Sequence, residues 1–164
     1  MRLLFDPSRD AQGIGYNVIQ AQVAIGSGGL WGKGFGEGTQ GGKRFLPEAA
    51  TDFIFAAIAE EQGLFGISVL LTLFGVLWWR LMRLGARAAH NFGRIFIFGY
   101  AWLLTIEVFI NAGMNVGLFP VVGLPLPFVS YGGSHLLSEF AGLGIVMAIA
   151  AQEIVKPTRH LVIE

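Results

Sequence analysis

Three long runs of apolar residues divide the chain at 64–81, 95–116 and 136–151. A helix needs roughly 20 apolar residues to cross the bilayer core, so we predict three transmembrane helices, the last one short. Apolar positions at 16–25 and 52–62 recur at helical spacing and predict short amphipathic helices, lying on the membrane or packed on the core. The expected fold class is an all-α integral membrane protein.

Two segments interrupt this pattern. Residues 26–42 are rich in glycine, and they contain a formal Gly-x-Gly-x-x-Gly at Gly36, Gly38 and Gly41. No strand precedes this match, so we reject it as a dinucleotide site. Residues 118–134 are broken by three prolines and a Gly-Gly pair. Irregular backbone at membrane depth must be buried in protein or face a wet cavity, which predicts a re-entrant or tightly packed loop.

Composition supports a membrane protein and narrows the chemistry. The chain is 54% hydrophobic and 13% charged, whereas soluble domains are about 25% charged. The formal net charge is zero, which gives no reason to expect a nucleic-acid partner. There are no cysteines, which excludes disulfides, thiol catalysis and cysteine-based metal sites. Carboxylate ligation of a metal stays open.

Basic residues predict the orientation. The connection at 80–94 carries four arginines and no acid, and the tail adds Lys156 and Arg159. The positive-inside rule puts both on the cytoplasmic side. The predicted domains are then an extracytoplasmic loop region at 1–51, a membrane domain at 52–152 and a cytoplasmic tail at 153–164, with Asp52 at the outer face. An outer segment of this length with no preceding span suggests that an earlier part of the protein is missing.

Polar residues within these apolar segments are the candidate functional groups. Glu48, Asp52 and Glu60 fall on one face at helical spacing. They are either a solvated helix start, which the helix dipole favours, or part of a site. Three residues of the second span, Glu107, Asn111 and Asn115, form a stripe that is either a hydrogen-bonded seam between helices or the lining of a cavity.

His135 and Glu139 are four residues apart at the start of the third span. Side chains at this spacing meet on one helix face. The pair is therefore either mutually satisfied or a catalytic dyad.

Three long motifs occur together: GSGGLWGKG at 26–34 with GTQ at 38–40; FLPE at 45–48 with TDFIF at 51–55; and FINAGMNVG at 109–117 running into GLPLPFVSYGGS at 123–134. In this order and spacing they resemble the SEDS family of peptidoglycan polymerases, the RodA/FtsW group. The resemblance covers about residues 12–152. The GTQ at 38–40 and Lys33 are more similar to the RodA (elongation) branch than to the FtsW (division) branch.

The resemblance implies a fold and a location. The chain resembles the C-terminal part of a ten-span bundle in the bacterial cytoplasmic membrane, with the catalytic side extracytoplasmic. Two positions depart from the family pattern. Ala50 stands where the family usually has histidine, and His135 stands where it usually has serine. The first departure bears on how Asp52 is held.

The resemblance also implies an activity. Family members join the disaccharides of lipid II into glycan strands, with a class B penicillin-binding protein transpeptidase as partner. Asp52 takes the role of the family's proposed catalytic residue. The resemblance gives no certain cofactor, and a divalent cation held by Glu48 is one option. The substrate-binding residues expected beside Asp52 are Lys33, Arg44, Glu48, Thr51, Asn111, Asn115, Ser130, Gly132, Gly133 and Ser134.

The charged groups and the polar stripe leave alternatives open. Lys33 and Arg44 either meet the pyrophosphate of the donor or are ordinary outer-surface charges. A lipid-linked precursor transporter, or flippase, would use the stripe from Glu107 to Asn115 as a polar path across the bilayer. A non-catalytic scaffold of the cell-wall synthesis complex would show neither polymerisation nor translocation.

Overall fold

A computed structural model describes residues 14–37 and 51–155 of the chain. All regular structure in these residues is helical: α1 is Ile14–Gly28, α2 is Ile54–Arg87, α3 is Asn91–Asn115 and α4 is Gly133–Val155. Three helices, α2, α3 and α4, are long and apolar enough to cross a membrane. The prediction of an all-α protein with three spans is therefore confirmed.

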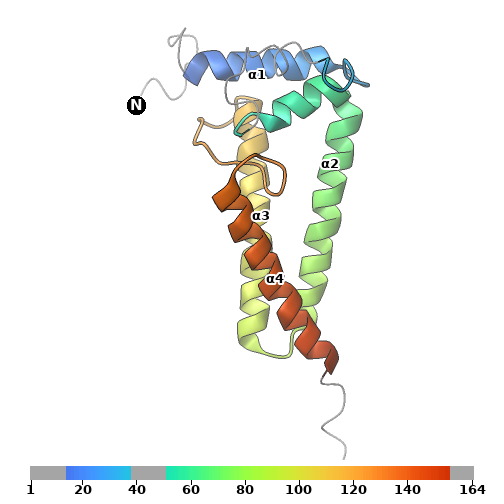
Figure 1. The fold of residues 1–164 in the computed structure, drawn as a ribbon, viewed down its shortest axis with the longest axis vertical. Coiled ribbons are helices and arrows are strands. Elements are labelled where there is room, and N and C mark those ends of the chain that lie inside the picture. The colour runs from blue at the N-terminus through green and yellow to red at the C-terminus, as the bar shows by residue number, and fades with distance from the viewer. Residues whose placement is uncertain (1–13, 38–50, 156–164) are drawn as a thin grey trace, which may run out of the picture.

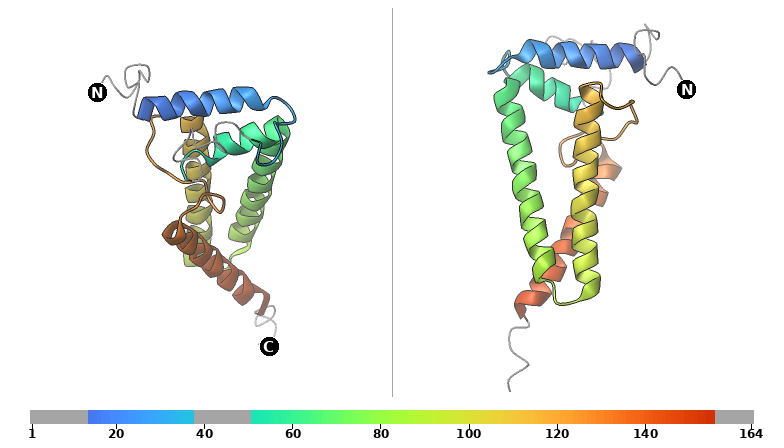
Figure 2. Two further views of the ribbon diagram at one scale, coloured as in Figure 1. Left: turned by 45° about the horizontal axis from the view of Figure 1, so that its top comes forward. Right: turned by 180° about the vertical axis from the view of Figure 1, so that it is seen from behind.

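The helices leave the molecule with two distinct ends (Figure 1). The long helices α2 and α3 run antiparallel, and α1 lies across the end where α2 begins and α3 finishes (Figures 1 and 2). The α2–α3 connection lies at the opposite end and is flanked by Arg80, Arg83, Arg87 and Arg94. We call these the Asp52 end and the arginine end. The first residues of α4 lie part-way along α3, so the irregular 116–132 loop turns back beside α3 (Figure 2).

A break at Gly63 divides α2 into a short and a long helix. Gly63 has φ 65° and ψ −160°, a conformation essentially restricted to glycine. A break of this kind frees backbone donors and acceptors on both sides. The segment 29–34 crosses the break and bonds to them: Lys33 N–H to Glu60 C=O (3.0 Å), Gly34 N–H to Glu61 C=O (3.0 Å), Leu64 N–H to Gly29 C=O (2.9 Å) and Phe65 N–H to Leu30 C=O (3.1 Å).

Small residues allow α1 to lie close against the short part of α2. A Cβ added to Gly28 would stand only 1.9 Å from the carbonyl oxygen of Ala59, so no larger residue fits at this crossing. The contact buries a small apolar cluster of Val18, Ala21, Ala24, Phe53 and Ala56. The packing of α1 on Phe53 thereby helps to fix the backbone just before α2.

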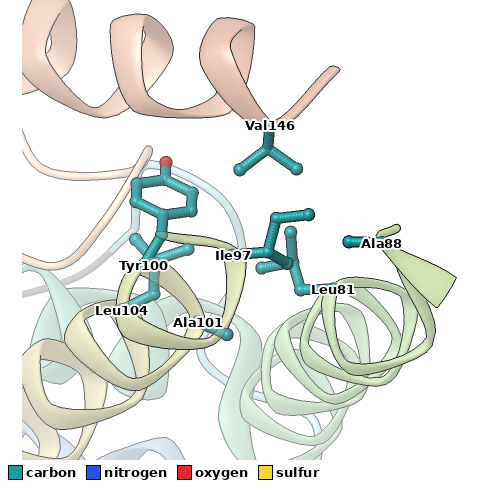
Figure 3. Packing of buried hydrophobic residues seen from close by; sticks show 7 residues of the cluster. All are labelled: Leu81, Ala88, Ile97, Tyr100, Ala101, Leu104 and Val146. Atoms are coloured by element: carbon teal, nitrogen blue, oxygen red, sulfur yellow. The ribbon is translucent and has the colours of Figure 1, made fainter. Parts of the chain in front are cut away.

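The arginine end is held by apolar packing. Its core is a cluster of seven buried residues from α2, α3, α4 and the α2–α3 connection: Leu81, Ala88, Ile97, Tyr100, Ala101, Leu104 and Val146 (Figure 3). Because lipid tails are as apolar as these side chains, the cluster holds the helices through close packing rather than through transfer out of water.

The start of α2 differs from the sequence prediction. The helix begins at Ile54, with Phe53 as its N-cap, and not at Asp52 as predicted. Residues 51–53 form a turn, because the carbonyl groups of Thr51 and Asp52 accept hydrogen bonds from side chains elsewhere in the fold. Asp52 therefore precedes the helix and does not share a helical face with Glu60.

Candidate functional site

Two asparagines of α3 hold the backbone of Asp52. Asn111 and Asn115 each donate from Nδ2 to the Asp52 carbonyl oxygen, at 3.1 Å in both cases. Asn115 also accepts from the backbone N–H of Ala56 through Oδ1 (3.2 Å). One side chain thus bonds to the turn before α2 and to the first turn of α2. Both asparagine side chains are completely buried.

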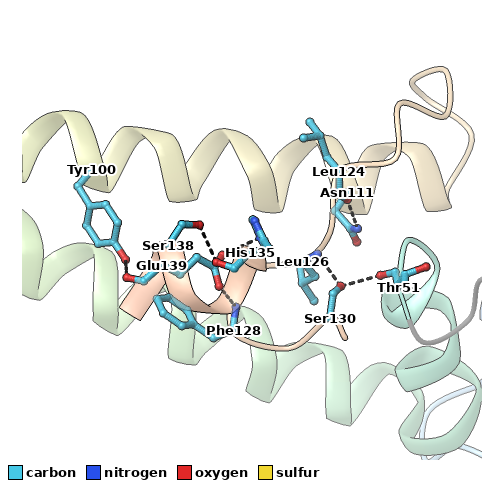
Figure 4. A network of polar contacts seen from close by, with 10 residues as sticks. All are labelled: Thr51, Tyr100, Asn111, Leu124, Leu126, Phe128, Ser130, His135, Ser138 and Glu139. Atoms are coloured by element: carbon cyan, nitrogen blue, oxygen red, sulfur yellow. Dashed lines mark hydrogen bonds and ion pairs between the residues drawn. The ribbon is translucent and has the colours of Figure 1, made fainter. Parts of the chain in front are cut away.

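The 116–132 loop contributes a third contact to the same turn. Ser130 donates from Oγ to the carbonyl oxygen of Thr51 (2.6 Å), and the same Oγ accepts from the N–H of Leu126 (2.7 Å) (Figure 4). Asn111 bonds to this loop as well, through the carbonyl oxygen of Leu124 (2.8 Å). The turn that carries Asp52 is therefore fixed to α3 and to the loop together.

The Asp52 carboxylate lies beside the loop. A Cβ built on Gly123 would be 3.5 Å from Oδ2 of Asp52, and Gly123 itself has φ +66°. Asp52 is half-buried, as a group must be if it is both held in place and accessible to a ligand. The candidate site thus consists of the Asp52 carboxylate on the fixed 51–53 turn, beside the 116–132 loop.

The buried positions of Asn111, Asn115 and Ser130 disfavour direct contact with a substrate. Their polar atoms bond to backbone groups of the turn, of α2, of α3 and of the loop. The stripe of Glu107, Asn111 and Asn115 had two interpretations, a hydrogen-bonded seam or the lining of a cavity. The bonds of its two asparagines correspond to the seam. The three side chains bond to the backbone of the turn that carries Asp52.

The other predicted site residues lie in varied surroundings. Lys33 Nζ is 2.7 Å from Oε1 of Glu60, whose side chain is completely buried. Thr51 is half-buried and offers its carbonyl to Ser130. Gly132 is half-buried and accepts from the N–H of Leu136 at the start of α4. Gly133 and Ser134 are exposed there. Arg44 and Glu48, and with Glu48 the predicted cation, lie outside the described residues.

The remaining stripe residue, Glu107, belongs to a second polar cluster that sequence reasoning found only in part. Its carboxylate faces the predicted pair His135 and Glu139, and ligand atoms of the three residues lie within 4.8 Å of one another. His135 Nε2 is 2.9 Å from Glu139 Oε1. Glu139 also accepts the N–H of Phe128 through Oε2 (2.8 Å) (Figure 4). Spacing within one helix predicts the His135–Glu139 pair, but only the packing of α3 on α4 brings Glu107 to it.

A family model described as a cell cycle protein, and named for FtsW, RodA and SpoVE, matches residues 1–154. The chain belongs to the FtsW/RodA/SpoVE family. The peptidoglycan glycosyltransferase MrdB of Escherichia coli K12 is 54% identical over 147 residues, which are 90% of this chain and 40% of MrdB. The probable peptidoglycan glycosyltransferase FtsW of Trichlorobacter lovleyi is 45% identical over 152 residues, 92% of this chain and 39% of that protein.

Solved structures of the FtsW/RodA/SpoVE family share the fold. A chain in a peptidoglycan synthase complex is 34% identical with a TM-score of 0.75, over 93% of this chain and 40% of that chain. The rod shape determining protein RodA of Thermus thermophilus is 33% identical with a TM-score of 0.62, over 85% of this chain and 49% of RodA. The present chain spans about two fifths of the length of the curated relatives that it matches.

Proposed function

We propose that this chain is the part of a peptidoglycan glycosyltransferase that holds its general base, Asp52, and that the enzyme polymerises lipid II during cell elongation. The observation that supports this most directly is the fixed turn at 51–53, which two buried asparagines and Ser130 hold at the loop-bearing end. Relatives at 54% and 45% identity are named peptidoglycan glycosyltransferases.

The reaction requires a base at the acceptor sugar. The acceptor 4-hydroxyl oxygen forms a bond to the anomeric carbon of the donor, the bond from that carbon to undecaprenyl pyrophosphate breaks, and the hydroxyl proton passes to the Asp52 carboxylate. A positioned base of this kind contributes about 10²–10⁴-fold. Fixing its backbone matters because a displacement of about 1 Å costs on the order of 100-fold in rate.

The proposed orientation puts Asp52 outside the cell. The turn at 51–53 and the four-arginine connection lie at opposite ends of the molecule (Figure 1), and the arginines favour the cytoplasmic side. Lipid II would then reach Asp52 from the outer leaflet. A class B penicillin-binding protein is the proposed partner, consistent with the likeness to a chain of a peptidoglycan synthase complex.

Lys33 is a weak candidate for the pyrophosphate site. Its ammonium group is 2.7 Å from the Glu60 carboxylate, so binding a phosphate there would compete with this partly buried ion pair. The Glu60 side chain is completely buried, so moving the ammonium group away from it is unfavourable. We therefore assign the donor's pyrophosphate to cationic groups other than Lys33.

The test uses a hybrid protein, in which this chain replaces the matching 147 residues of E. coli MrdB. The hybrid is purified with its transpeptidase and given labelled lipid II, and glycan strands are resolved on a gel. We expect Asp52→Asn to abolish polymer, and Glu37→Gln, an exposed acid in the 29–37 loop, to leave it unchanged. Full-length strands from the Asp52→Asn hybrid would overturn the assignment. Lipid II translocation in liposomes without polymer would instead indicate the flippase.

A further inference from the structure

A group of three ionisable side chains lies between α3 and α4, separate from the turn that holds Asp52. Glu107 is on α3, while His135 and Glu139 lie on the first turns of α4. Their ligand atoms are within 4.8 Å of one another. All three residues belong to helices long and apolar enough to span a membrane. Ionisable groups at such positions are costly, so an intramembrane cluster normally has a partner or a ligand.

Three buried atoms in this cluster make no hydrogen bond within the part of the chain that the structure describes. Glu107 Oε2, His135 Nε2 and Glu139 Oε1 are each buried and make no hydrogen bond to any described residue. His135 Nε2 and Glu139 Oε1 are 2.9 Å apart, an ion-pair contact if the imidazole is protonated, but they form no hydrogen bond. The Glu139 side chain is only 3% exposed. Buried polar atoms in native proteins are almost always hydrogen-bonded, so three such atoms without hydrogen bonds in one cluster favour a ligand between them.

The donor set fits a divalent transition metal ion. We propose that Glu107, His135 and Glu139 bind one Zn²⁺-class ion through Glu107 Oε2, His135 Nε2 and Glu139 Oε1. One imidazole and two carboxylates are ordinary zinc ligands, with a fourth position left for water. Zinc–ligand distances near 2.1 Å place tetrahedral ligand atoms about 3.4 Å apart, so ligand atoms that lie within 4.8 Å of one another would move closer by at most about 1.4 Å. The ion's two positive charges would balance the two carboxylates in a medium that solvates neither.

The contacts around the cluster resemble the outer shell of a metal site. Glu139 Oε2, the oxygen not used for the ion, accepts the N–H of Phe128 at 2.8 Å. Tyr100 donates its hydroxyl to the Glu139 carbonyl (2.7 Å) and Ser138 donates to the His135 carbonyl (2.7 Å) (Figure 4). The Phe128 bond orients a ligand side chain, as outer-shell bonds do at metal centres, and the other two bonds fix the backbone that carries the ligands.

The bound ion would fasten the loop that holds Asp52. Phe128 has φ +59°, which is uncommon for a bulky residue, and its N–H is held by Glu139. Two residues further on, Ser130 bonds to Thr51. A metal that fixes Glu139 therefore fixes Phe128 and, through the loop, the turn at 51–53. The metal site itself stands apart from the proposed function, because the test below measures binding.

The test is a Zn²⁺ titration of the full chain in detergent, purified through a histidine-free tag and stripped with a chelator. Affinity is measured against a chromophoric chelator, and X-ray absorption reports the first shell of ligands. We expect one Zn²⁺ per chain, with one nitrogen and two carboxylates bound. His135→Ser introduces the residue that the family usually has here, so it should fold and yet weaken binding at least 100-fold. Glu139→Gln and Glu107→Gln should each weaken it at least tenfold.

Matched controls separate this site from adventitious binding. The chain has two other histidines, His90 and His160, and their joint replacement by alanine should leave the affinity unchanged, as should Glu37→Gln. Wild-type affinity equal to that of His135→Ser would overturn the proposal and indicate that the three groups share protons instead. A shell of water oxygens alone would also overturn it. Helix content of each variant is checked by circular dichroism, and a variant that misfolds is replaced by His135→Gln.

Discussion

The Asp52 end and the arginine end share the helices α2 and α3 but are held together differently. At the Asp52 end, side-chain amides and a hydroxyl bond to irregular backbone at the 51–53 turn and the 116–132 loop. At the arginine end, regular helices pack through seven buried side chains, of which only Tyr100 carries a polar group (Figure 3). The position of the backbone is therefore set at the Asp52 end by directional hydrogen bonds, and at the arginine end by the close packing of apolar side chains.

The difference explains where substitutions should affect function. Hydrogen bonds fix distance and angle, so they can position a catalytic group. Packing in lipid contributes stability with less directional information. We therefore expect changes at the Asp52 end to alter activity beyond their effect on stability, and changes at the arginine end to alter stability alone.

The largest effect should come from Gly63→Ala. The new Cβ would be 2.4 Å from the backbone nitrogen of Gly32, at φ +65°, and the four bonds across the break would be disrupted. We expect a loss on the order of 3 kcal/mol in unfolding free energy, measured by SDS titration in mixed micelles. Gly75→Ala is the matched control, because its Cβ meets open space within the same helix. It should stabilise by about 0.5–1 kcal/mol. Equal stability of the two variants would contradict the role of the break.

Asn115→Leu should have the next largest effect and the most specific one. It removes a donor to the Asp52 carbonyl and the acceptor of the Ala56 N–H. Leaving a buried N–H unpaired costs about 1–3 kcal/mol. In the MrdB hybrid we expect polymerisation to fall on the order of 100-fold through misplacement of Asp52. Asn91→Leu, at an exposed position of the same helix, should change neither the unfolding free energy nor the rate of polymerisation. Unaltered polymerisation by Asn115→Leu would show that the asparagine does not position the base.

The sequence predicted the spans well because long apolar runs are unambiguous. The residues 64–81, 95–116 and 136–151 lie within or nearly within α2, α3 and α4. The start of α2 was wrong by two residues, since helical spacing cannot show that Asn111, Asn115 and Ser130 hold the carbonyls of residues 51 and 52. Those bonds join residues 59 to 79 positions apart, which is beyond any local pattern.

The motifs gave the residues proposed for the site, but they could not give the contacts of those residues. The motifs led to Asp52, Asn111, Asn115 and Ser130, but no local pattern shows that the last three are buried and bond to the backbone of the 51–53 turn. Lys33 was predicted as a substrate contact without Glu60, because a loop lysine and a helix glutamate 27 residues apart share no local pattern. Glu107 was placed in the asparagine stripe, but the crossing of α4 puts it with His135 and Glu139.

A smaller effect is expected at the arginine end from Leu81→Ala. Leu81 is 2% exposed within the apolar cluster. The loss in unfolding free energy should be about 1–2 kcal/mol, below the 2–5 kcal/mol seen in soluble cores. In a membrane the leucine side chain gains no transfer out of water when it packs, so only its packing contacts are lost. Polymerisation by the hybrid should stay within about twofold. Leu73→Ala, at a 63% exposed position of the same helix, is the control and should be near neutral. A loss of polymerisation as large as that of Asn115→Leu would erase the distinction between the two ends.

The smallest effect, from Tyr100→Phe, tests whether the two ends communicate. Tyr100 packs its ring in the apolar cluster and donates its hydroxyl to the carbonyl of Glu139, the residue that holds Phe128 of the loop. Removing one hydrogen bond should cost about 0.5–1.5 kcal/mol, measured by the same SDS titration. If the ends are independent, polymerisation by the hybrid should match that of Leu81→Ala. A loss of rate well beyond that of Leu81→Ala would mean that the hydroxyl acts on Asp52 through Glu139, Phe128 and the loop. The path of bonds from α4 to the catalytic turn would then be part of the mechanism and not only of the fold.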